Sequence, residues 1–312
     1  MPYRAFQDVH SVTEEALTVD KNVLLIINPN SGDGEAKRWV YDMTAGLLSR
    51  FDFVTVYFSK CAGDIMRVVR EKSGDYEAVV CCGGDGTLNE TITGIYLADT
   101  SPMLGYIPTG TVNDFATSHK IPKGIKGAIE KIVSGTPVEY DVGLLGDRPF
   151  SYVAAFGAFT DVAYLTPQEI KASLGRTAYI AEAAKRLFSL TPIEVSYTQD
   201  GKEISDKFIY GMVANSKTVG GIRFFEGNSR EALRDGELEV LLIRFPDTAG
   251  QLQQALSGIL TQKANDFVYK FTVSEITFRF GGSAPWTLDG EFGGDYREVT
   301  VKCLPSRIRV IE

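Results

Sequence analysis

The sequence predicts two folded parts: an α/β domain with a parallel sheet covered by helices on both faces, and a β-rich domain with an antiparallel, sandwich-like sheet. Apolar runs alternate with helical patterns over residues 22–141, whereas short strands and turn signals fill residues 142–312. A length of 312 residues suits two modest domains. We therefore expect an N-terminal extension over residues 1–21, followed by these two domains, with the last strands packing back on the first domain.

Four apolar runs in the first domain predict buried strands, because parallel strands are covered on both faces. They lie at residues 23–27, 53–58, 78–82 and 104–107. Helical patterns follow the first three runs. One helix places Trp39, Val40, Met43 and Leu47 on one face, and the others are predicted near residues 64–72 and 87–97. Ligands bind to such sheets at the loops that follow the strands, so these loops form the candidate site.

The second domain is predicted from short apolar segments bounded by turn residues. Two helices, near residues 170–189 and 248–260, interrupt the strands. The predicted strands cover residues 142–145, 151–156, 194–198, 208–215, 238–243, 272–280, 298–304 and 308–311.

Composition excludes several classes of protein. With 40 acidic and 32 basic residues the net charge is -8, so general nucleic-acid binding is not expected. Four scattered cysteines give neither a disulfide scaffold nor a zinc motif, and Cys81 and Cys82 lie in an apolar run that should bury them. There is no apolar leader and no apolar stretch of about 18 residues, so we expect a cytoplasmic protein whose membrane contact is peripheral.

The strongest local motif is Gly83-Gly84-Asp85-Gly86-Thr87, directly between a predicted strand and a predicted helix. Glycines let backbone amides approach a ligand, and the helix N-terminus presents free N–H groups to an anion. Asp85 would repel a bare phosphate, so it indicates a neighbouring cation such as Mg²⁺ or a ribose hydroxyl. The alternative is a glycine-rich turn with a capping aspartate.

Two further loops share this character. Residues 108–116 (Pro-Thr-Gly-Thr-Val-Asn-Asp-Phe-Ala) again join a strand to a helix, and residues 28–32 (Asn-Pro-Asn-Ser-Gly) end the first strand. Three such loops on one sheet edge, without a Walker A or GxGxxG sequence, indicate a nucleotide site of another design.

In this order the motifs resemble the diacylglycerol kinase catalytic-domain family of lipid kinases, which includes sphingosine and ceramide kinases. The resemblance also rests on Asp141-Val142-Gly143, Asp235-Gly236-Glu237-Leu238 and Asp289-Gly290-Glu291, and it covers nearly all of the chain from Asn22. It implies an NAD kinase-like α/β nucleotide domain, a β-rich lipid-substrate domain and a cleft between them for ATP and the lipid head group.

The resemblance also implies roles for individual residues. Glu291 matches the proposed general base and Asp289 its partner. Asp85, Asp114 and Asp141 would belong to the network around a catalytic Mg²⁺. The expected ATP contacts are Asn28, Pro29, Asn30, Ser31, Gly32, Ser59, Gly83, Gly84, Asp85, Gly86, Thr87, Leu88, Asn89, Thr111 and Asn113.

Phosphoryl transfer needs positioning, a metal, and a carboxylate that accepts the proton of the attacking hydroxyl. In an extended segment Asp289 and Glu291 would point to one face, with Gly290 leaving room between them. The alternative for Asp289-Gly290 is a hairpin turn with Glu291 solvated. Similarly, Asp235 with the carbonyls of Leu238 and Val240 resembles a second, structural Mg²⁺ site, or else Asp235-Gly236 is a plain turn.

A lipid substrate would require peripheral membrane contact. Residues 170–189, with Lys171, Arg176, Lys185 and Arg186 among apolar residues, are one candidate, although such a helix more often packs on its own domain. Phe224-Phe225 beside Arg223 is another candidate. An exposed sheet edge in the second domain is a candidate for homodimer contact.

The sequence predicts an ATP- and Mg²⁺-dependent lipid kinase that phosphorylates a hydroxyl of diacylglycerol or a related lipid. An NAD kinase-like enzyme shares residues 83–87, but the later motifs argue against it. A catalytically silent lipid or nucleotide binder is the third alternative, which the intact Asp85, Asp289 and Glu291 disfavour.

Overall fold

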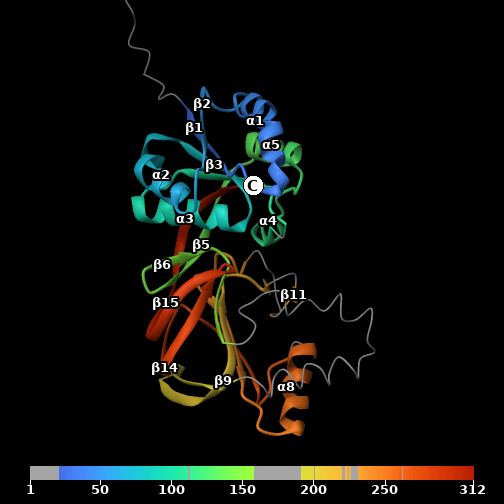
Figure 1. Cartoon of the computed structure of the whole chain (residues 1–312), viewed down its shortest axis with the longest axis vertical. Coiled ribbons are helices and arrows are strands. Elements are labelled where there is room, and N and C mark those ends of the chain that lie inside the picture. Colours follow the sequence, from blue (N-terminus) through green and yellow to red (C-terminus); the bar gives the residue numbers. More distant parts are fainter. Residues whose placement is uncertain are drawn as a thin grey trace, which may run out of the picture.

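The computed structural model describes residues 21–111, 113–157, 191–199, 201–219, 222–223, 225, 231–261 and 263–312. It shows an α/β part, at the top of Figure 1, and a β-rich part below it. The predicted extension (residues 1–20 of it), the predicted helix at residues 170–189 and Phe224 lie outside the described residues.

The α/β part follows the predicted alternation of strands and helices. Its elements are β1 (Asn22–Ile27), the 3-10 helix η1 (Gly32–Trp39), α1 (Val40–Leu47), β2 (Phe53–Phe58), α2 (Asp64–Lys72), η2 (Ser73–Asp75), β3 (Ala78–Gly83), α3 (Asp85–Ala98), β4 (Met103–Pro108), α4 (Asp114–Ser118) and α5 (Ile125–Ser134).

These strands form a parallel sheet in the order β2-β1-β3-β4, with β1 paired in register to both β2 and β3. All residues of β3 and β4 are buried, as expected for strands covered on both faces. Figure 1 shows α2 and α3 on one side of the sheet and α1, α4 and α5 on the other. The carboxyl ends of the four strands therefore meet at one edge, where the connecting loops can form a site.

The β-rich part contains antiparallel strands and one described helix. Its elements are β5 (Pro137–Leu145), β6 (Arg148–Phe150), β7 (Val153–Gly157), β8 (Ile193–Gln199), β9 (Lys202–Ala214), the short pair β10 (Thr218–Val219) and β11 (Ile222–Arg223), β12 (Leu238–Arg244), α8 (Ala249–Thr261), β13 (Val268–Val273), β14 (Glu275–Leu288) and β15 (Glu291–Ile311).

The antiparallel strands run in the order β13-β12-β9-β7-β14-β15, while β8 pairs with both β9 and β14. Aromatic rings fill the core on one side of these strands: Phe156 packs edge-on against Phe278, and Trp286 lies 4.8 Å from Phe156 between ring centroids. On the other side, Leu252 and Leu256 of α8 pack with Met212 and Leu241. This part is therefore held together mainly by buried apolar area.

The long strand β15 belongs to both parts. Its first half pairs with β14, its second half pairs antiparallel with β5, and Arg309 and Val310 pair in parallel with Met103 and Leu104 of β4. The register shifts between Leu304 and Ile308, where Ser306 adopts a positive φ of 51°. One continuous strand thus closes the parallel sheet and contributes to the antiparallel one (Figure 1).

The predicted fold class is confirmed: an alternating α/β region with a parallel sheet precedes an antiparallel β-rich region. The element predictions differ from the structure in several places. Residues 298–304 and 308–311 are one strand instead of two, and the strand predicted at residues 272–280 is divided between β13 and β14. The helix α5 was not predicted, although Ile125, Ala128, Ile129 and Ile132 follow a helical spacing. Among the described residues, no helix is both long and apolar enough to cross a membrane. The domain boundaries stay predictions.

Candidate active site

Three loops at the carboxyl edge of the parallel sheet touch one another through glycines. A Cβ atom on Gly32 would lie 2.4 Å from the carbonyl oxygen of Thr109, and one on Gly110 would lie 2.6 Å from the Cα of Gly84. Side chains would not fit at these contacts. The loops after β1, β3 and β4 therefore share one rim because glycine permits their backbones to approach.

A cavity of about 350 Å³ opens beside this rim. It brings together residues of the loops after β1, β2 and β3, one residue of α2, three residues of α3, and Glu291 at the start of β15. The lining residues are Asn28, Asn30, Ser31, Ser59, Lys60, Cys61, Ala62, Ile65, Gly84, Gly86, Thr87, Glu90 and Glu291.

Eight predicted site residues thus line one cavity: Asn28, Asn30, Ser31, Ser59, Gly84, Gly86, Thr87 and Glu291. The cavity is also lined by five residues that were not predicted: Lys60, Cys61, Ala62, Ile65 and Glu90. Four of these belong to the loop after β2 and the start of α2. Because a predicted strand ends at Phe58, the loop that follows it could have been predicted as part of the site.

Other predicted ATP contacts shape the loops without lining the cavity. Asn113 is buried, and its Oδ1 accepts hydrogen bonds from the Gly110 N–H (3.0 Å) and the Tyr106 hydroxyl (3.2 Å). Leu88 is fully buried in the core, and Thr111 is exposed. Pro29, Gly32, Gly83, Asp85 and Asn89 also lie outside the set that lines the cavity.

Asp85 lies at the first residue of α3 and faces the start of α4. Its carboxylate accepts two long hydrogen bonds, from the N–H groups of Asp114 (3.3 Å) and Phe115 (3.4 Å). The structure therefore brings Asp85 and the backbone of Asp114 together, as the prediction for the metal network required. Bonds of this length leave the Asp85 oxygens able to accept a further ligand.

Asp141 serves a different purpose from the one predicted. It is buried, and its two carboxylate oxygens accept hydrogen bonds from the N–H groups of Gly236 (2.7 Å) and Ser306 (2.9 Å). It does not line the cavity, and within the described part of the chain no three acidic, histidine or cysteine residues are grouped to hold a metal. The predicted cluster of Asp85, Asp114 and Asp141 is thus not assembled, because Asp141 bonds to the bend before β12 and to the register shift within β15.

The predicted structural metal site has mixed support. Asp235 is exposed and accepts a hydrogen bond from the Glu237 N–H (3.0 Å); desolvation raises its pKa, which this hydrogen bond opposes. Leu238 and Val240 are completely buried in β12, between β9 and β13. Between them, Glu239 pairs with Lys217 (3.0 Å) and leaves its second carboxylate oxygen without a hydrogen-bond partner. Metal binding here stays a prediction.

Asp289 is the most heavily hydrogen-bonded carboxylate near the cavity. Its Oδ1 accepts the N–H groups of Tyr152 (3.0 Å) and Val153 (2.9 Å). Its Oδ2 accepts the N–H and hydroxyl of Ser151 (both 2.9 Å) and the side-chain amide of Asn89 (2.6 Å). Burial raises the pKa of Asp289, and these donors oppose that shift by stabilising the charged form.

Asp289 and Gly290 form a turn, so the prediction of an extended segment with Asp289 and Glu291 on one face was wrong. Their φ angles are 49° and 92°, which aspartate and glycine tolerate better than other residues. The turn sends Asp289 toward Ser151 and leaves Glu291 at the cavity. There the Glu291 carboxylate lies so close to Gly86 that a Cβ on Gly86 would be 3.1 Å from Oε1.

The loops and the cavity can be compared with known proteins. The family model of the diacylglycerol kinase catalytic domain matches residues 22–145, which include the loops after β1, β2, β3 and β4. Residues 22–145 are therefore similar to a diacylglycerol kinase catalytic domain. The chain is 29% identical over 281 residues to diacylglycerol kinase from Bacillus subtilis (strain 168), covering 88% of this chain and 91% of the relative. A diacylglycerol kinase from Staphylococcus carnosus (strain TM300) is also 29% identical, over 277 residues, with coverages of 88% and 90%.

Solved structures support the same fold. A crystal structure of a diacylglycerol kinase from Bacillus anthracis str. Sterne superposes with a TM-score of 0.72 at 20% identity, covering 94% of this chain and 97% of that one. A second structure from the same organism gives a TM-score of 0.76 at 23% identity, with coverages of 96% and 98%. The likeness extends over both parts of the chain, so the β-rich part belongs to the same architecture.

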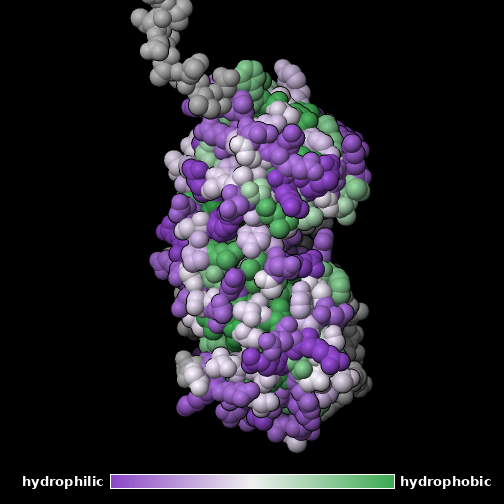
Figure 2. Space-filling model, turned by 90° about the vertical axis from the view of Figure 1, so that its left-hand side faces the viewer, coloured by the Kyte–Doolittle hydropathy of each residue, from purple (hydrophilic) through white to green (hydrophobic). Residues whose placement is uncertain are grey.

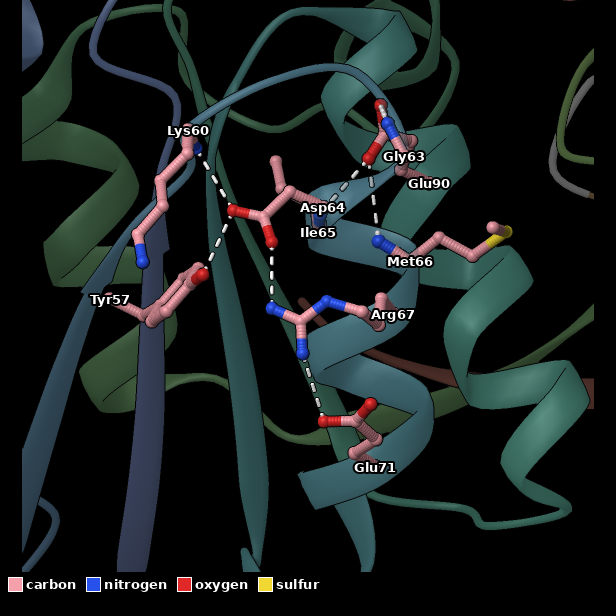
Figure 3. Close-up of polar contacts among 9 residues, drawn as sticks. All are labelled: Tyr57, Lys60, Gly63, Asp64, Ile65, Met66, Arg67, Glu71 and Glu90. Atoms are coloured by element: carbon pink, nitrogen blue, oxygen red, sulfur yellow. Dashed lines mark hydrogen bonds and ion pairs between the residues drawn. The ribbon is translucent and has the colours of Figure 1, made fainter.

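Within the α/β part, two acidic residues fix the cavity wall after β2 (Figure 3). Glu90 of α3 accepts hydrogen bonds from the N–H groups of Gly63 (2.9 Å), Ile65 (3.1 Å) and Met66 (3.3 Å). It thereby satisfies donors at the N-terminus of α2 that have no partner within the helix. The wall of the cavity is thus tied to the helix that follows the glycine-rich loop.

Asp64 holds the same wall from its other side (Figure 3). Its carboxylate accepts hydrogen bonds from the Lys60 N–H (2.9 Å) and the Tyr57 hydroxyl (2.8 Å), and pairs with Arg67 at 2.8 Å. The Arg67 guanidinium, together with the Lys60 N–H, lowers the pKa of Asp64 from its ordinary value. Asp64 is therefore a charged anchor for the loop after β2 that lines the cavity.

Proposed function

We propose that this chain transfers the γ-phosphoryl group of ATP to the free hydroxyl of diacylglycerol, forming phosphatidic acid and ADP. The observation that carries the proposal is the position of Glu291. A carboxylate from the β-rich part lies at a cavity lined by the glycine-rich loops of a diacylglycerol kinase catalytic domain. Those loops suit a nucleotide, and the carboxylate suits a hydroxyl that must lose its proton.

The phosphate groups fit the start of α3. In the first turn of this helix the N–H groups lack partners within the helix, and Gly84 and Gly86 line the cavity without side chains. The positive end of the helix dipole also favours negative charge there. Asn28, whose amide donates to the Thr87 hydroxyl (3.1 Å), holds the loop after β1 against this turn.

The donor set around Asp85 fits Mg²⁺ in the form kinases use, where one or two carboxylates and the substrate phosphates share the ion with water. Asp85 would hold it, because its two hydrogen bonds are long, and Asp114, whose N–H donates one of them, is a second candidate. When bound, the ion would neutralise charge that develops on the phosphates. Asp141 does not fit this role, since its carboxylate bonds to Gly236 and Ser306.

Glu291 acts as the base. It accepts the proton of the diacylglycerol hydroxyl as that oxygen bonds to the γ-phosphorus and the bond between the γ-phosphorus and the bridging oxygen breaks. Its neighbour Gly86 leaves room for the carboxylate beside the phosphate-binding turn. The side chain is exposed, so the hydroxyl can approach it from the side of the β-rich part.

Transfer of labelled γ-phosphate from ATP tests the proposal, with mixed micelles of diacylglycerol, sphingosine or phosphatidylglycerol, and with NAD, as acceptors. We expect labelled phosphatidic acid, and a decrease of about 10²-fold or more in Glu291→Gln, because general base catalysis contributes about that much. Glu298→Gln, an exposed glutamate of the same strand paired with Arg279, is the matched control and should keep its activity.

Transfer to NAD would favour the NAD kinase-like alternative. ATP binding without transfer to any acceptor would favour a silent binder. Equal transfer by wild type and Glu291→Gln would remove Glu291 from the mechanism.

We further propose that the enzyme reaches its lipid by peripheral contact with a membrane. Phe292, next to Glu291, is 64% exposed, and Arg148 donates hydrogen bonds to the Phe292 (3.3 Å) and Gly293 (2.6 Å) carbonyls beside it. Figure 2 shows hydrophobic residues at the surface of the β-rich part on the side that carries β6 and β15. Phe225, in contrast, is buried and packs in the α8 core, so it is not an insertion point.

Replacing Phe292 with serine tests the membrane contact. We expect Phe292→Ser to lower transfer to diacylglycerol in vesicles by about tenfold and to leave transfer to a short-chain, water-soluble diacylglycerol unchanged, because only vesicle binding uses the ring. Phe53→Ser, which removes an exposed phenylalanine from β2, is the control. A parallel decrease on both substrates would show that Phe292 acts in catalysis and not at the membrane.

A further inference from the structure

The two parts of the molecule are joined beside the cavity by one short side-chain hydrogen bond. Asn89 of α3 donates from its amide to Asp289, at 2.6 Å, across 200 positions of sequence. Asn89 lies about one helical turn after Gly86, which lines the cavity. The bond therefore connects the helix of the glycine-rich loop to the turn that carries Glu291.

The other bonds of Asp289 hold it rigidly in the β-rich part. Three successive N–H groups, from Ser151 to Val153, and the Ser151 hydroxyl point at the carboxylate. The N–H of Asp289 itself donates to the Val153 carbonyl at 2.8 Å. With Asn89 the carboxylate accepts five hydrogen bonds, and an ionised carboxylate offers about four lone-pair sites. It has no capacity left for a metal or for the proton of a substrate.

We infer that Asn89 and Asp289 are positioning residues that form a clamp between the nucleotide-binding helix and the hairpin, and that this clamp holds Glu291 against Gly86. The clamp adds two positioning residues to the proposed phosphate transfer, and its kinetic test rests on that proposed function. Asp289 thus acts through the hairpin and not as a partner in proton transfer, and Asn89 acts through Asp289 and not as a nucleotide contact.

The geometry gives the clamp a path from Gly86 to Glu291. Gly86 and Asn89 share the first turns of α3, and Asp289 and Glu291 are separated by one residue of a tight turn. Glu291 lies near Gly86, because a Cβ added to Gly86 would be 3.1 Å from its Oε1. The bond between Asn89 and Asp289 thus limits how far the backbone of Glu291 can move from α3, which is the positioning that catalysis requires of a base.

Steady-state kinetics of Asn89→Ala and Asp289→Asn test the clamp in the full chain. We expect kcat to decrease about tenfold or more in each variant while the KM for ATP changes less than about twofold, because Glu291 is displaced and the nucleotide loops are not. The kcat of the double variant should be little lower than that of the more affected single variant, since both substitutions break the same hydrogen bond. Asp99→Asn, an exposed position at the end of the same helix, is the control.

Hydrogen–deuterium exchange gives a second readout that does not depend on activity. We expect faster exchange of the amides of Tyr152, Val153 and Gly290 in Asn89→Ala, with unchanged exchange in β1 and β3. A raised KM for ATP at constant kcat would overturn the clamp and make Asn89 a nucleotide contact. Unchanged exchange at the hairpin would overturn it even if wild type transferred no phosphate, so failure of the proposed function can be distinguished from failure of the clamp.

Discussion

At the scale of single residues, Gly86 limits the room available to the Glu291 carboxylate. Gly86 lies in the first turn of α3 and has no positive φ, so an alanine there fits the backbone and favours the helix by up to about 1 kcal/mol. Its methyl group, however, would lie 3.1 Å from the Glu291 carboxylate and displace it.

We therefore expect Gly86→Ala to lower kcat by about tenfold or more while the melting temperature stays equal or rises, because positioning of the base fails and folding does not. Thermal unfolding and phosphate transfer measured on one preparation check this. Gly250→Ala is the matched control, since that glycine also lies near the start of a helix and an added Cβ would meet nothing within 4 Å. Loss of stability in Gly86→Ala without loss of kcat would contradict the interpretation.

Single residues differ in how far their roles follow from sequence. Gly84, Gly86 and Thr87 were predicted because a glycine-rich loop between a strand and a helix has a local physical meaning. The role of Asp141 was not, because its partners Gly236 and Ser306 are distant in the chain. The hydrogen bond from Asn89 to Asp289 was not predicted for the same reason, because Asp289 is 200 positions away.

At the scale of elements, α2 depends on carboxylates at its N-terminus. Asp64 begins the helix and holds the Lys60 loop, and its pKa is lowered by Arg67 and the Lys60 N–H. A carboxylate whose pKa is lowered in the folded state stabilises that state fully at pH values above its ordinary pKa of 3.8. This stabilisation is lost as the pH falls through the lowered pKa.

We expect Asp64→Asn to decrease the free energy of unfolding by about 1.5–3 kcal/mol near neutral pH, because hydrogen bonds to a charged group are lost. The difference from wild type should shrink as the pH falls below about 4, where the wild-type carboxylate also becomes protonated. Urea unfolding at several pH values measures both effects. Glu71→Gln, which changes only the exposed end of the Arg67 pair, should cost less than about 1 kcal/mol. A difference that is independent of pH would show that the charge of Asp64 is not responsible.

Helices and strands were predicted correctly where the sequence shows one clear hydrophobic pattern. The buried strands β1 to β4 read as apolar runs, and their positions agree with the structure to within about two residues. The continuity of β15 was not predicted, because Pro305 and Ser306 look like a break; in the structure the strand continues past a local change of register. The partner strands β4, β5 and β14 make it continuous, and sequence patterns do not show partners.

At the scale of the whole molecule, β15 pairs with strands of both parts, so we expect the two parts to unfold as one cooperative unit. The chain contains two tryptophans, and they report on different parts: Trp39 packs against the α/β core, whereas Trp286 is fully buried in the β-rich core. Unfolding of either part removes pairing from β15 and thus from the other part.

We expect Trp39→Phe, which leaves only Trp286, to give the same urea midpoint by fluorescence as by far-ultraviolet circular dichroism, which reports on the whole chain. Trp286→Phe, which leaves only Trp39, should behave in the same way. The comparison is made within each variant, so a change in overall stability does not affect it. Separated midpoints for the two methods would show that the parts unfold independently.

The strand β15 is translated last, and this affects how the chain can fold during its synthesis. Because Arg309 and Val310 complete the sheet beside β4, the edge of β4 stays uncovered until about two hundred further residues have been translated. Apolar strands with an open edge readily pair with other chains. The parallel sheet of the nascent α/β region therefore cannot be completed until translation has ended. For the same reason, a fragment comprising residues 22–145 should aggregate when it is expressed without the remainder of the chain.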